Sequence, residues 1–587
     1  MPFNKYFQDE LSYLRELGRE FSSAYPALAP MLADRGGDPD VERLLEGVAF
    51  LTGRIRQKLD DELPELMFAV ASLLFPQIVR PLPSAAILEI TPLPNVLRDA
   101  RVVAAGSEFC SVKVDGTSCR FRSCTDCEIA PWTLDTIRLE TLAGGAHQLR
   151  LELSSGSAAM LQVLPSKLRL HLAGDDRNSQ TLLAWMTHHV ESVALVEPQL
   201  GGTERSIELD PAVISAAGFA ENESLLPATE AAFPGFRLLA EYYMLPAKFA
   251  FVDIAGLRRI EELNPDLTRV GVLIRFDMPL PMRQVSADDV KLHCVPVINL
   301  FETTADPIRV VPGREQHLLR AAGLQPTHGD VYAIRKVETV SRGSSERLEI
   351  PPFFDFSHAA SMNDDARIYY TTHTRPSVVG DGADVYIALG SPENSGITPQ
   401  ADVLSIDLLA SNGSLAKAVR AGEINVATSS SPPYASFRNL RAVTPHVPPP
   451  LGHELQWRVT AHAAMNLRAL TEPEVLRTAL GVYNLHAIVD RQAARANELR
   501  IQAIKDVRVK PTEKLFRGAA IRGISVEIDL DDSGFAGDGD LCLFGSVMER
   551  FFAEYVSINS FSRTSVKSVR SNLVFSWPAR SGNQTLL

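Results

Sequence analysis

Acidic residues with the spacing of a calcium loop occur near the C-terminus. In DLDDSGFAGDGD, Asp529, Asp531 and Ser533 precede Gly534 and Asp540, and carboxylates at alternate positions can surround Ca²⁺. An EF-hand loop needs a helix on each side, whereas the preceding GISVEI alternates like a strand. The pattern therefore favours an acidic, glycine-rich turn, and we expect no bound metal here.

A second candidate for metal binding consists of four of the six cysteines, which end in one CxxC: Cys110, Cys119, Cys124 and Cys127. Structural zinc sites usually combine two close pairs separated by a longer insert. Here the cysteines lie within alternating, strand-like segments, whose successive side chains point to opposite faces. Ordinary core or surface thiols explain them better than a zinc site.

The densest histidine cluster is THHVE, with His188, His189 and Glu191. Adjacent residues on a helix diverge by about 100°, so both imidazoles do not readily bind one ion. The chain has no GxSxG elbow, P-loop, GxGxxG turn or HExxH helix. We therefore expect no catalytic residues and no cofactor.

Paired acids favour exposed helix faces over acid catalysis. A raised carboxyl pKa needs an apolar wall, and these acids have Arg43 and Lys58 nearby instead. The pairs are Asp60 with Asp61, and Glu42 with Glu46.

Charge argues against nucleic acid as a partner, because the chain has a formal net charge of −13. One local exception is the segment from Arg491 to Arg522, with nine Lys or Arg against three acids. It predicts a solvated helix face followed by a basic loop, and the alternative is docking on an acidic protein surface.

Composition indicates a globular protein of the cytosol. The 587 residues are 45% hydrophobic and 22% charged, without an apolar run long enough to span a membrane. Acids within the first dozen residues do not fit a secretory signal, and six cysteines are too few for a disulfide scaffold.

Two amphipathic helices open the chain. The spacing predicts one over residues 38–66, with Asp38 as its cap and Pro39 at its first position. Its apolar residues recur at steps of three and four: Val41, Leu44, Leu45, Val48, Leu51, Ile55, Leu59 and Leu63. Upstream, NKYFQDELSYLRELGREFSSAYP repeats the design with Phe7, Leu11, Leu14 and Phe21.

Two arrangements could bury these stripes. One is a helical hairpin that packs on itself or on the rest of the chain, which short loops favour. The other is a bundle shared with another subunit. Periodicity does not separate the two.

Strand-like alternation begins at about residue 85, after prolines at 76, 81 and 83. We expect a helix near SQTLLAWMTHHVESV, another within residues 232–257, and linkers or long loops at 392–400 and 428–450. From Glu472 the helical period returns, followed by a strand, an acidic turn and the helix SVMERFFAEYVSI.

The prediction is an α+β protein in several parts. N-terminal amphipathic helices precede several β-rich domains and a mixed α/β C-terminal part. The predicted ranges are a helical region over 1–84, β-rich domains over 85–230 and 231–400, and a mixed domain over 401–587.

Five segments together carry a family resemblance: YFQDELSYLRELGREFSSAYP, DPDVERLLEGVAFLTGRIRQKLDDELPEL, FPGFRLLAEYYMLPAKFAF, CVPVINLFETTADPI and LFGSVMERFFAEYVSINSF. In order and spacing they closely resemble the TssF family (VasA or ImpG), the large wedge subunit of the type VI secretion baseplate. Where that family often has a Cys-Thr-Asn-Arg run, this chain has LLASNGSLAKAV around Asn412, and its tail after Phe561 also departs.

The resemblance implies a structural role and a fold like that of phage tail wedge proteins. Family members pair as two copies with one TssG subunit, bind the TssK adaptor, and surround a VgrG hub with TssE, so that tube and contractile sheath can polymerise. It implies a place at the cytosolic face of the inner membrane. The helices would then contribute to a central bundle or dimer contact through Phe7, Leu11, Leu14, Val41, Leu44, Val48, Leu51 and Ile55.

Other interpretations stay open. The chain could be a wedge of another contractile injection apparatus, an adaptor acting alone, or a metal-dependent enzyme that uses Asp529 or Cys127. The aromatic helix face with Val547, Phe551, Phe552 and Tyr555 favours core over interface. We expect Gly235, Pro246, Pro296 and Pro307 at turns that maintain the fold.

Overall fold

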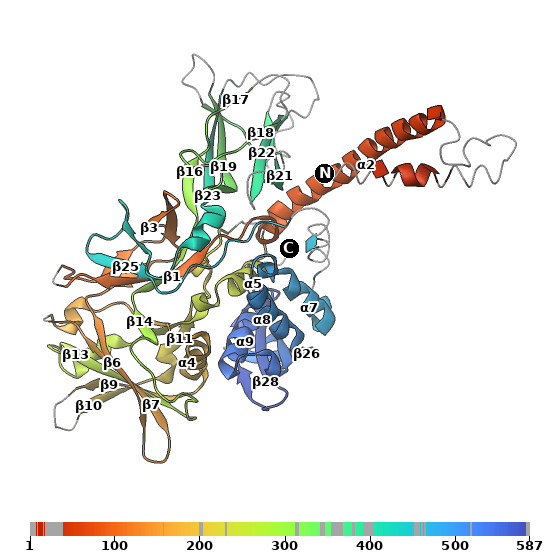
Figure 1. The fold of residues 1–587 in the computed structure, drawn as a ribbon. Helices are drawn as coiled ribbons and strands as arrows, with labels where there is room; N and C mark the ends of the chain where they lie inside the picture. The colour runs from red at the N-terminus through yellow and green to blue at the C-terminus, as the bar shows by residue number, and fades with distance from the viewer. Residues whose placement is uncertain are drawn as a thin grey trace.

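The chain folds as an α+β protein in a computed structural model, which confirms the predicted fold class. Figure 1 shows a lower body, an upper β-rich unit and one projecting helix. The domain boundaries predicted from the sequence stay a prediction. The structure describes residues 7–8, 10–15, 17, 39–94, 96–156, 158–198, 204–228, 232–310, 316–340, 347–353, 368–377, 382–390, 403–450, 458–459, 462, 465, 467–516 and 519–582.

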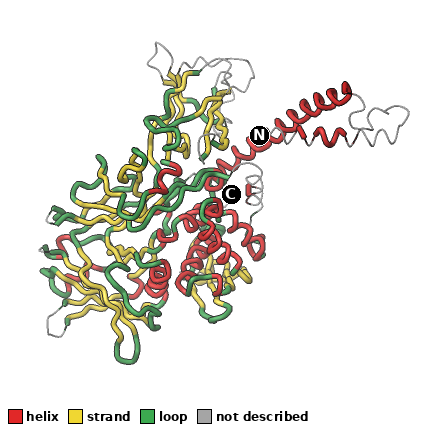
Figure 2. The backbone as a smooth tube through the Cα atoms, in the orientation of Figure 1, coloured by secondary structure: helices red, strands yellow, loops and turns green. Residues whose placement is uncertain are grey.

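The projecting helix is α2, Pro39–Leu74 (Figure 2). It begins at Pro39 as predicted and runs past residue 66, and Asp38 lies outside the described residues. Proline lacks the N–H that a helix interior needs, so Pro76 separates α2 from the short helix α3, Pro76–Val79. Residues 7–8, 10–15 and 17 are helical and lie beside α2, where Arg15 Nη2 donates to Glu42 Oε2 at 2.7 Å.

A six-stranded sheet, ordered β24-β3-β4-β15-β1-β25, lies between the lower body and the upper unit (Figure 1). Its strands are β1 (Ala85–Pro92), β3 (Glu108–Val114), β4 (Thr117–Ser123), β15 (Cys294–Ile298), β24 (Ile424–Ala427) and β25 (Ala435–Asn439). The prediction of a linker over 428–450 is wrong for β25, whose alternate residues are buried against the sheet's core. Leu88 of β1 lies opposite Asn439 of β25.

Pro296 lies inside strand β15, so its predicted place at a turn is wrong. It faces Ile87 of β1 on one side, while its carbonyl accepts from Cys124 N at 3.0 Å on the other. In a strand, the N and O of one residue point the same way. The missing N–H of Pro296 therefore faces the end of β4, where regular pairing has stopped, and no ladder bond to β1 is lost.

The lower body contains three further sheets, ordered β10-β9-β13-β7-β6, β11-β12-β8-β14 and β2-β5. Their strands are β2 (Arg101–Val103), β5 (Cys127–Ile129), β6 (Thr133–Thr141), β7 (His147–Ser154), β8 (Leu168–Leu172), β9 (Val190–Glu197), β10 (Arg205–Leu209), β11 (Ile214–Ala217), β12 (Phe251–Ile254), β13 (Arg269–Phe276) and β14 (Val290–Leu292). Helix α4, Asp176–His188, starts before the predicted segment because Asp175 caps it by accepting from Asn178 N.

Helix α5, Pro234–Met244, confirms the short helix predicted within 232–257. Gly235 lies inside this helix rather than at a turn. A Cβ there would come 2.6 Å from the ring of Phe233 and 3.0 Å from that of Phe551, so this glycine permits close packing.

The upper unit comprises the described parts of residues 301–411, and we call it the arm. Two sheets form it, ordered β16-β23-β19-β20, with β17 also pairing β23, and β18-β22-β21. The strands are β16 (Phe301–Thr304), β17 (Ile308–Arg309), β18 (Gln316–Leu318), β19 (Asp330–Val340), β20 (Arg347–Glu349), β21 (Tyr369–Pro376), β22 (Ala383–Gly390) and β23 (Val403–Ser411). The predicted linker at 392–400 lies outside the described residues.

Among its described residues, the C-terminal part combines helices α7, α8 and α9 with a sheet ordered β26-β27-β28-β29, to which β30 adds. The elements are α7 (Pro473–Val482), α8 (Arg491–Gln502), β26 (Ile504–Phe516), β27 (Ala519–Leu530), α9 (Asp538–Ala553), β28 (Phe561–Ser568), β29 (Val574–Ser576) and β30 (Arg580–Ser581). A long β26–β27 hairpin replaces the basic loop predicted from the sequence.

Short 3-10 helices connect these elements: η2 (Met160–Val163), η3 (Pro211–Val213), η4 (Glu221–Glu223), η5 (Pro246–Phe249), η6 (Leu257–Glu262), η8 (Gly413–Ala418), η9 (Ala469–Thr471), η10 (Leu485–Ile488) and η11 (Asp532–Gly534).

The main core joins the C-terminal end of α2 to the C-terminal helices. The ring of Phe236 on α5 lies 5.9 Å from that of Phe75 and 6.2 Å from that of Phe551 on α9. Val547, Phe551 and Phe552 are fully buried, which confirms that the predicted aromatic face belongs to the core. Helix α9 also packs closely on α4, because a Cβ at Gly539 would come 2.4 Å from the backbone of Gln180.

Candidate functional site

One face of helix α2 exposes four large apolar side chains. The exposed fractions are 70% for Leu44, 40% for Val48, 63% for Leu51 and 60% for Ile55. These residues follow one another at steps of four, three and four, so they form one stripe along the helix. We call it the open face. Contiguous apolar surface of this kind usually marks an interaction site.

The opposite side of α2 is covered. Ala49 is fully buried and Gly53 is also buried, four residues further on. Small side chains at this spacing let a second helix approach closely. The helical N-terminal segment lies on this side of α2, because its Arg15 bonds to Glu42, seven residues before Ala49. Leu11 of that segment is buried, while Phe7 and Leu14 are half-buried.

The predicted interaction residues therefore fall into two groups. Leu44, Val48, Leu51 and Ile55 lie on the open face, whereas Phe7, Leu11 and Leu14 belong to the segment beside α2. The side chain of Val41 lies outside the described residues. Ala49 and Gly53 were not predicted as contact residues, although their spacing of four was a usable signal for a close helix contact. The first arrangement, a hairpin, thus covers one side of α2 and leaves the other exposed.

The acidic turn at residues 529–540 uses its carboxylates for internal contacts. Asp529 accepts from both terminal nitrogens of Arg508, at 2.9 and 3.0 Å, and Asp540 is 2% exposed and accepts from Arg500 Nε at 3.0 Å. Strand β27 precedes the turn, as the sequence predicted. Hydrogen bonds from the side chain and backbone of Ser533 lower the pKa of Asp531 to about 2, so a serine already holds that carboxylate.

The four cysteines of the candidate zinc site remain separate thiols. Burial raises the pKa of Cys119 to about 11 and that of Cys124 and Cys127 to about 12. Metal binding needs the thiolate, so these cysteines are poor ligands. Within the described ranges, no group of three His, Cys, Asp or Glu side chains could hold a metal ion.

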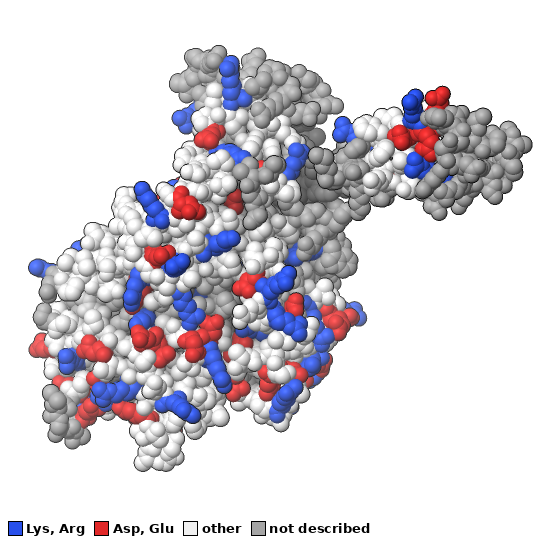
Figure 3. Space-filling view, in the orientation of Figure 1, with Lys and Arg blue, Asp and Glu red and all other residues white. Residues whose placement is uncertain are grey.

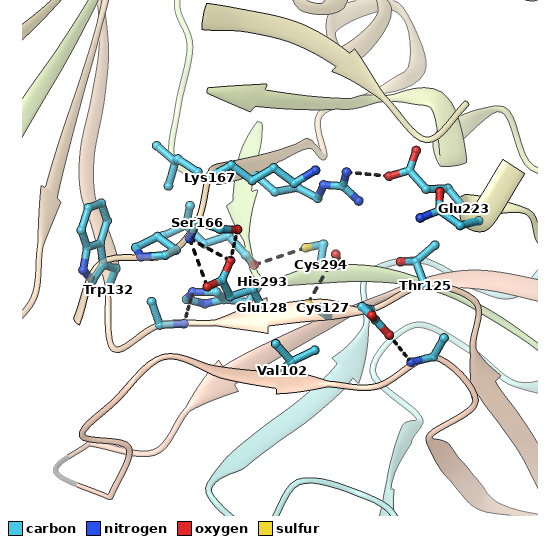
Figure 4. Close-up of a pocket in the computed structure, with 18 residues that line it drawn as sticks. Val102, Thr125, Cys127, Glu128, Trp132, Ser166, Lys167, Glu223, His293 and Cys294 are labelled. Atoms are coloured by element: carbon cyan, nitrogen blue, oxygen red, sulfur yellow. Dashed lines mark hydrogen bonds and ion pairs between the residues drawn. The ribbon is translucent and has the colours of Figure 1, made fainter. Parts of the chain in front are cut away.

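Cys127 does line a cavity of about 390 Å³ between the six-stranded sheet and strand β8 (Figure 4). Several of its polar groups bond to one another. Glu128 accepts from the backbone N of Ser166, and Arg169 donates to Glu223 at 2.6 Å. Cys127 itself lies 3.9 Å from the carbonyl of Cys294, to which its thiol donates. We assign no chemistry to this cavity.

His188 and His189 contact different partners. The ring of His188 packs edge-on against Phe575 and Trp577, at 5.3 and 5.2 Å between ring centroids. His189 Nδ1 lies 3.0 Å from Asp277 Oδ1. The two imidazoles therefore have separate structural roles.

The basic segment from Arg491 to Arg522 is largely matched by acids. Arg508 contacts Asp529 and Glu527, and Arg500 contacts Asp540. Figure 3 shows blue and red side chains interspersed over the visible face of the body. The contacts of Arg508 support the interpretation of a solvated face, whereas the pair of Arg500 and Asp540 is largely buried.

In the part of the chain that the structure describes, no helix is long and apolar enough to cross a membrane. A long helix with an exposed apolar stripe, joined to a many-sheeted body, is typical of a class of protein that assembles with other chains.

Comparison with known proteins agrees with that class and specifies it. The family model "Type VI secretion system, TssF" matches residues 2–584, and the chain belongs to this family. The "Type VI secretion system component TssF1" of Pseudomonas aeruginosa is 27% identical over 622 aligned residues, which cover 99% of this chain and 98% of the relative.

Solved structures support the same assignment. A chain of the type VI secretion TssK-TssF-TssG baseplate subcomplex, revealed by cryo-electron microscopy, matches with a TM-score of 0.78 and 31% identity over 93% of this chain and 99% of that chain. A chain of the baseplate complex from the type VI secretion system matches with a TM-score of 0.58 and 30% identity over the whole of both chains. The protein is a component of the type VI secretion baseplate.

Proposed function

We propose that this chain is a wedge subunit that uses the open face of α2 to assemble with a TssG-like subunit and a second copy of itself. The observation that best supports this proposal is the apolar stripe on the helix that projects from the body. Leu44, Leu51 and Ile55 in this stripe are each at least 60% exposed. A chain of a TssK-TssF-TssG subcomplex is similar to this one along almost its full length, which supports a similar set of partners.

The energy available from the open face is sufficient for a stable contact. Burying a large aliphatic side chain contributes roughly 1.5 to 3 kcal/mol, and the four residues here are 40 to 70% exposed. Together they would supply on the order of 5 kcal/mol before the cost of association. The steps of four, three and four suit a helical partner, because they match the seam of a coiled coil.

Family membership supports a proposal about the wider assembly. We propose that the wedge binds a TssK adaptor and, with TssE, surrounds a VgrG hub, from which tube and contractile sheath polymerise. It would lie in the cytosol, at the cytosolic face of the inner membrane once assembled, and touch the membrane only through other subunits. The match to a type VI family favours this apparatus over another contractile injection apparatus.

We propose a structural role without catalysis, cofactor, metal or nucleic acid. The candidate carboxylates are held by Arg508 and Arg500, and burial keeps the candidate thiols protonated. A net charge of −13 also opposes binding to phosphate backbones.

Co-expression with TssG-like and TssK-like partners tests the proposal. Size exclusion with mass determination should recover a complex with two copies of this chain for each TssG-like subunit. A monomer that leaves these partners unbound would contradict it.

A further inference from the structure

We use "the body" for the lower body together with the six-stranded sheet. The chain passes between the body and the arm at two places, and one buried asparagine lies at each. Asn299 follows β15 of the body and precedes β16 of the arm, whereas Asn412 follows β23 of the arm and precedes η8 of the body. Both side chains are 0% exposed. The two residues are far apart in sequence and meet at the foot of the arm.

The two asparagines bond to each other twice, once through the backbone N–H of Asn412 and once between their side-chain amides. Asn412 N donates to Asn299 Oδ1 at 2.7 Å, and Asn299 Nδ2 donates to Asn412 Oδ1 at 2.9 Å. These bonds therefore connect the two chain segments that pass between the body and the arm. A buried amide that loses these partners is costly, at about 1 to 3 kcal/mol for each unsatisfied group.

Strand β4 of the body and the arm itself complete the network. Arg120 of β4 donates its backbone N to Asn412 Oδ1 at 3.0 Å and accepts from Asn299 Nδ2 through its carbonyl at 2.7 Å. Asn412 Nδ2 donates to the carbonyl of His328 in the arm at 3.2 Å. The side chains of the two asparagines thus bond to backbone on both sides of the junction.

Two further contacts stabilise the same junction between the arm and the body. Thr117 of β4 lies 2.8 Å from the ring Nδ1 of His328, and the Arg120 guanidinium lies 4.5 Å from the ring centroid of Phe301 in β16. Apolar contact also attaches the arm, because Tyr332 and Leu409 belong to the main core. Apolar packing is tolerant of direction, whereas hydrogen bonds weaken steeply when misaligned.

We propose that Asn299 and Asn412 form an elbow latch that fixes one direction of the arm relative to the body. The bonds of the latch form and break together, because each asparagine bonds both to the other asparagine and to the backbone of Arg120. The arm therefore does not drift through intermediate directions but changes direction when the whole latch opens. Both asparagines are positioning residues, and the inference does not depend on the partners proposed above.

The test measures the distance between the arm and the body in the full chain. Spin labels are placed at two exposed positions, Leu348→Cys on β20 and Val102→Cys on β2, in a background with Cys110→Ser and Cys124→Ser, which removes the two half-buried native thiols. Pulsed electron resonance should give one narrow distance distribution for the parent chain. Asn412→Ala or Asn299→Ala should roughly double its width, and the double variant should add little more.

Asn439→Ala is the matched control. Asn439 is 1% exposed and also bonds to backbone three times, to Ile424 N, the carbonyl of Arg420 and the carbonyl of Arg441, but it lies within the body. It should lower the melting temperature as the latch variants do and leave the distance distribution narrow.

Latch variants that melt earlier but keep the narrow distribution would overturn the proposal, since they would show an ordinary structural role. If Asn412→Ala does not fold, Asn412→Ser takes its place, because serine retains a hydroxyl acceptor. Thr117→Val, which removes one contact at the foot and spares both amides, should broaden the distribution less.

Discussion

Leu44 and Ala49 lie on different faces of helix α2, about 140° apart at about 100° for each residue. Leu44 is 70% exposed and Ala49 is fully buried. The helix thus has a small residue on the side where the N-terminal segment bonds to Glu42 and presents a large one outward. This division is the physical basis of the assembly proposal.

A buried ion pair stabilises the body, and neutralising one partner should be costly. Glu241 and Lys248 are each 1% exposed and bond to one another, and Glu241 Oε1 accepts from Leu225 N and Leu226 N at 2.9 Å. Glu241→Gln keeps an acceptor for both amides but leaves the Lys248 charge unpaired, so we expect a loss of about 3 kcal/mol.

Denaturant unfolding measures this loss, and the double variant Glu241→Gln with Lys248→Met is the control. Because it removes the unpaired charge of Lys248, the double variant should recover part of the lost stability. If the free energy of unfolding of the double variant falls below that of Glu241→Gln by as much again, the unpaired charge of Lys248 is not the cause of the loss.

Acid should destabilise the body through His171, which is 3% exposed on strand β8. Burial lowers the pKa of this imidazole from 6.5 to about 3, and the nearby Arg441 acts in the same direction. The native state therefore keeps His171 neutral, while the unfolded chain takes up the proton below its ordinary pKa. The contribution to stability is complete above pH 6.5 and is lost progressively as the pH falls toward 3.

The measurement is the slope of the free energy of unfolding against pH. His171→Phe should make the free energy of unfolding less dependent on pH between 6.5 and 4, by up to about 1.4 kcal/mol for each pH unit. An unchanged slope would assign the acid sensitivity to other groups.

Calcium should not bind the acidic turn. Asp529 and Asp540 are held by Arg508 and Arg500, so a cation would have to displace two guanidinium groups. Calorimetric titration with millimolar Ca²⁺ should give no saturable heat, and dialysis against a chelator should leave the melting temperature unchanged. Saturable binding that Asp529→Asn abolishes would contradict this prediction and reopen the enzyme interpretation.

Local chemistry made several elements predictable from sequence. Pro39 marked the start of α2, and the prolines after residue 75 marked the change from helices to strands. The period of GISVEI predicted strand β27 and so disfavoured an EF-hand. These signals depend on neighbouring residues alone.

Features that depend on distant partners were not predictable. Strand β25 looked like a linker because its proline-rich surroundings gave no sign that Asn439 would lie opposite Leu88. Pro296 could sit in a central strand because β4 ends beside it. The open face was predicted as an apolar stripe, yet its exposure depends on which side of α2 the N-terminal segment covers.

The most direct test of the central claim is complex formation by Leu44→Asp with Leu51→Asp, measured by size exclusion with mass determination after co-expression with the TssG-like subunit. Glu46→Ala, an exposed change on the same helix, is the control and should assemble normally. We expect the double variant to keep the circular dichroism and melting temperature of the parent chain but to fail to form the complex. A folded double variant that assembles like the parent chain would contradict it.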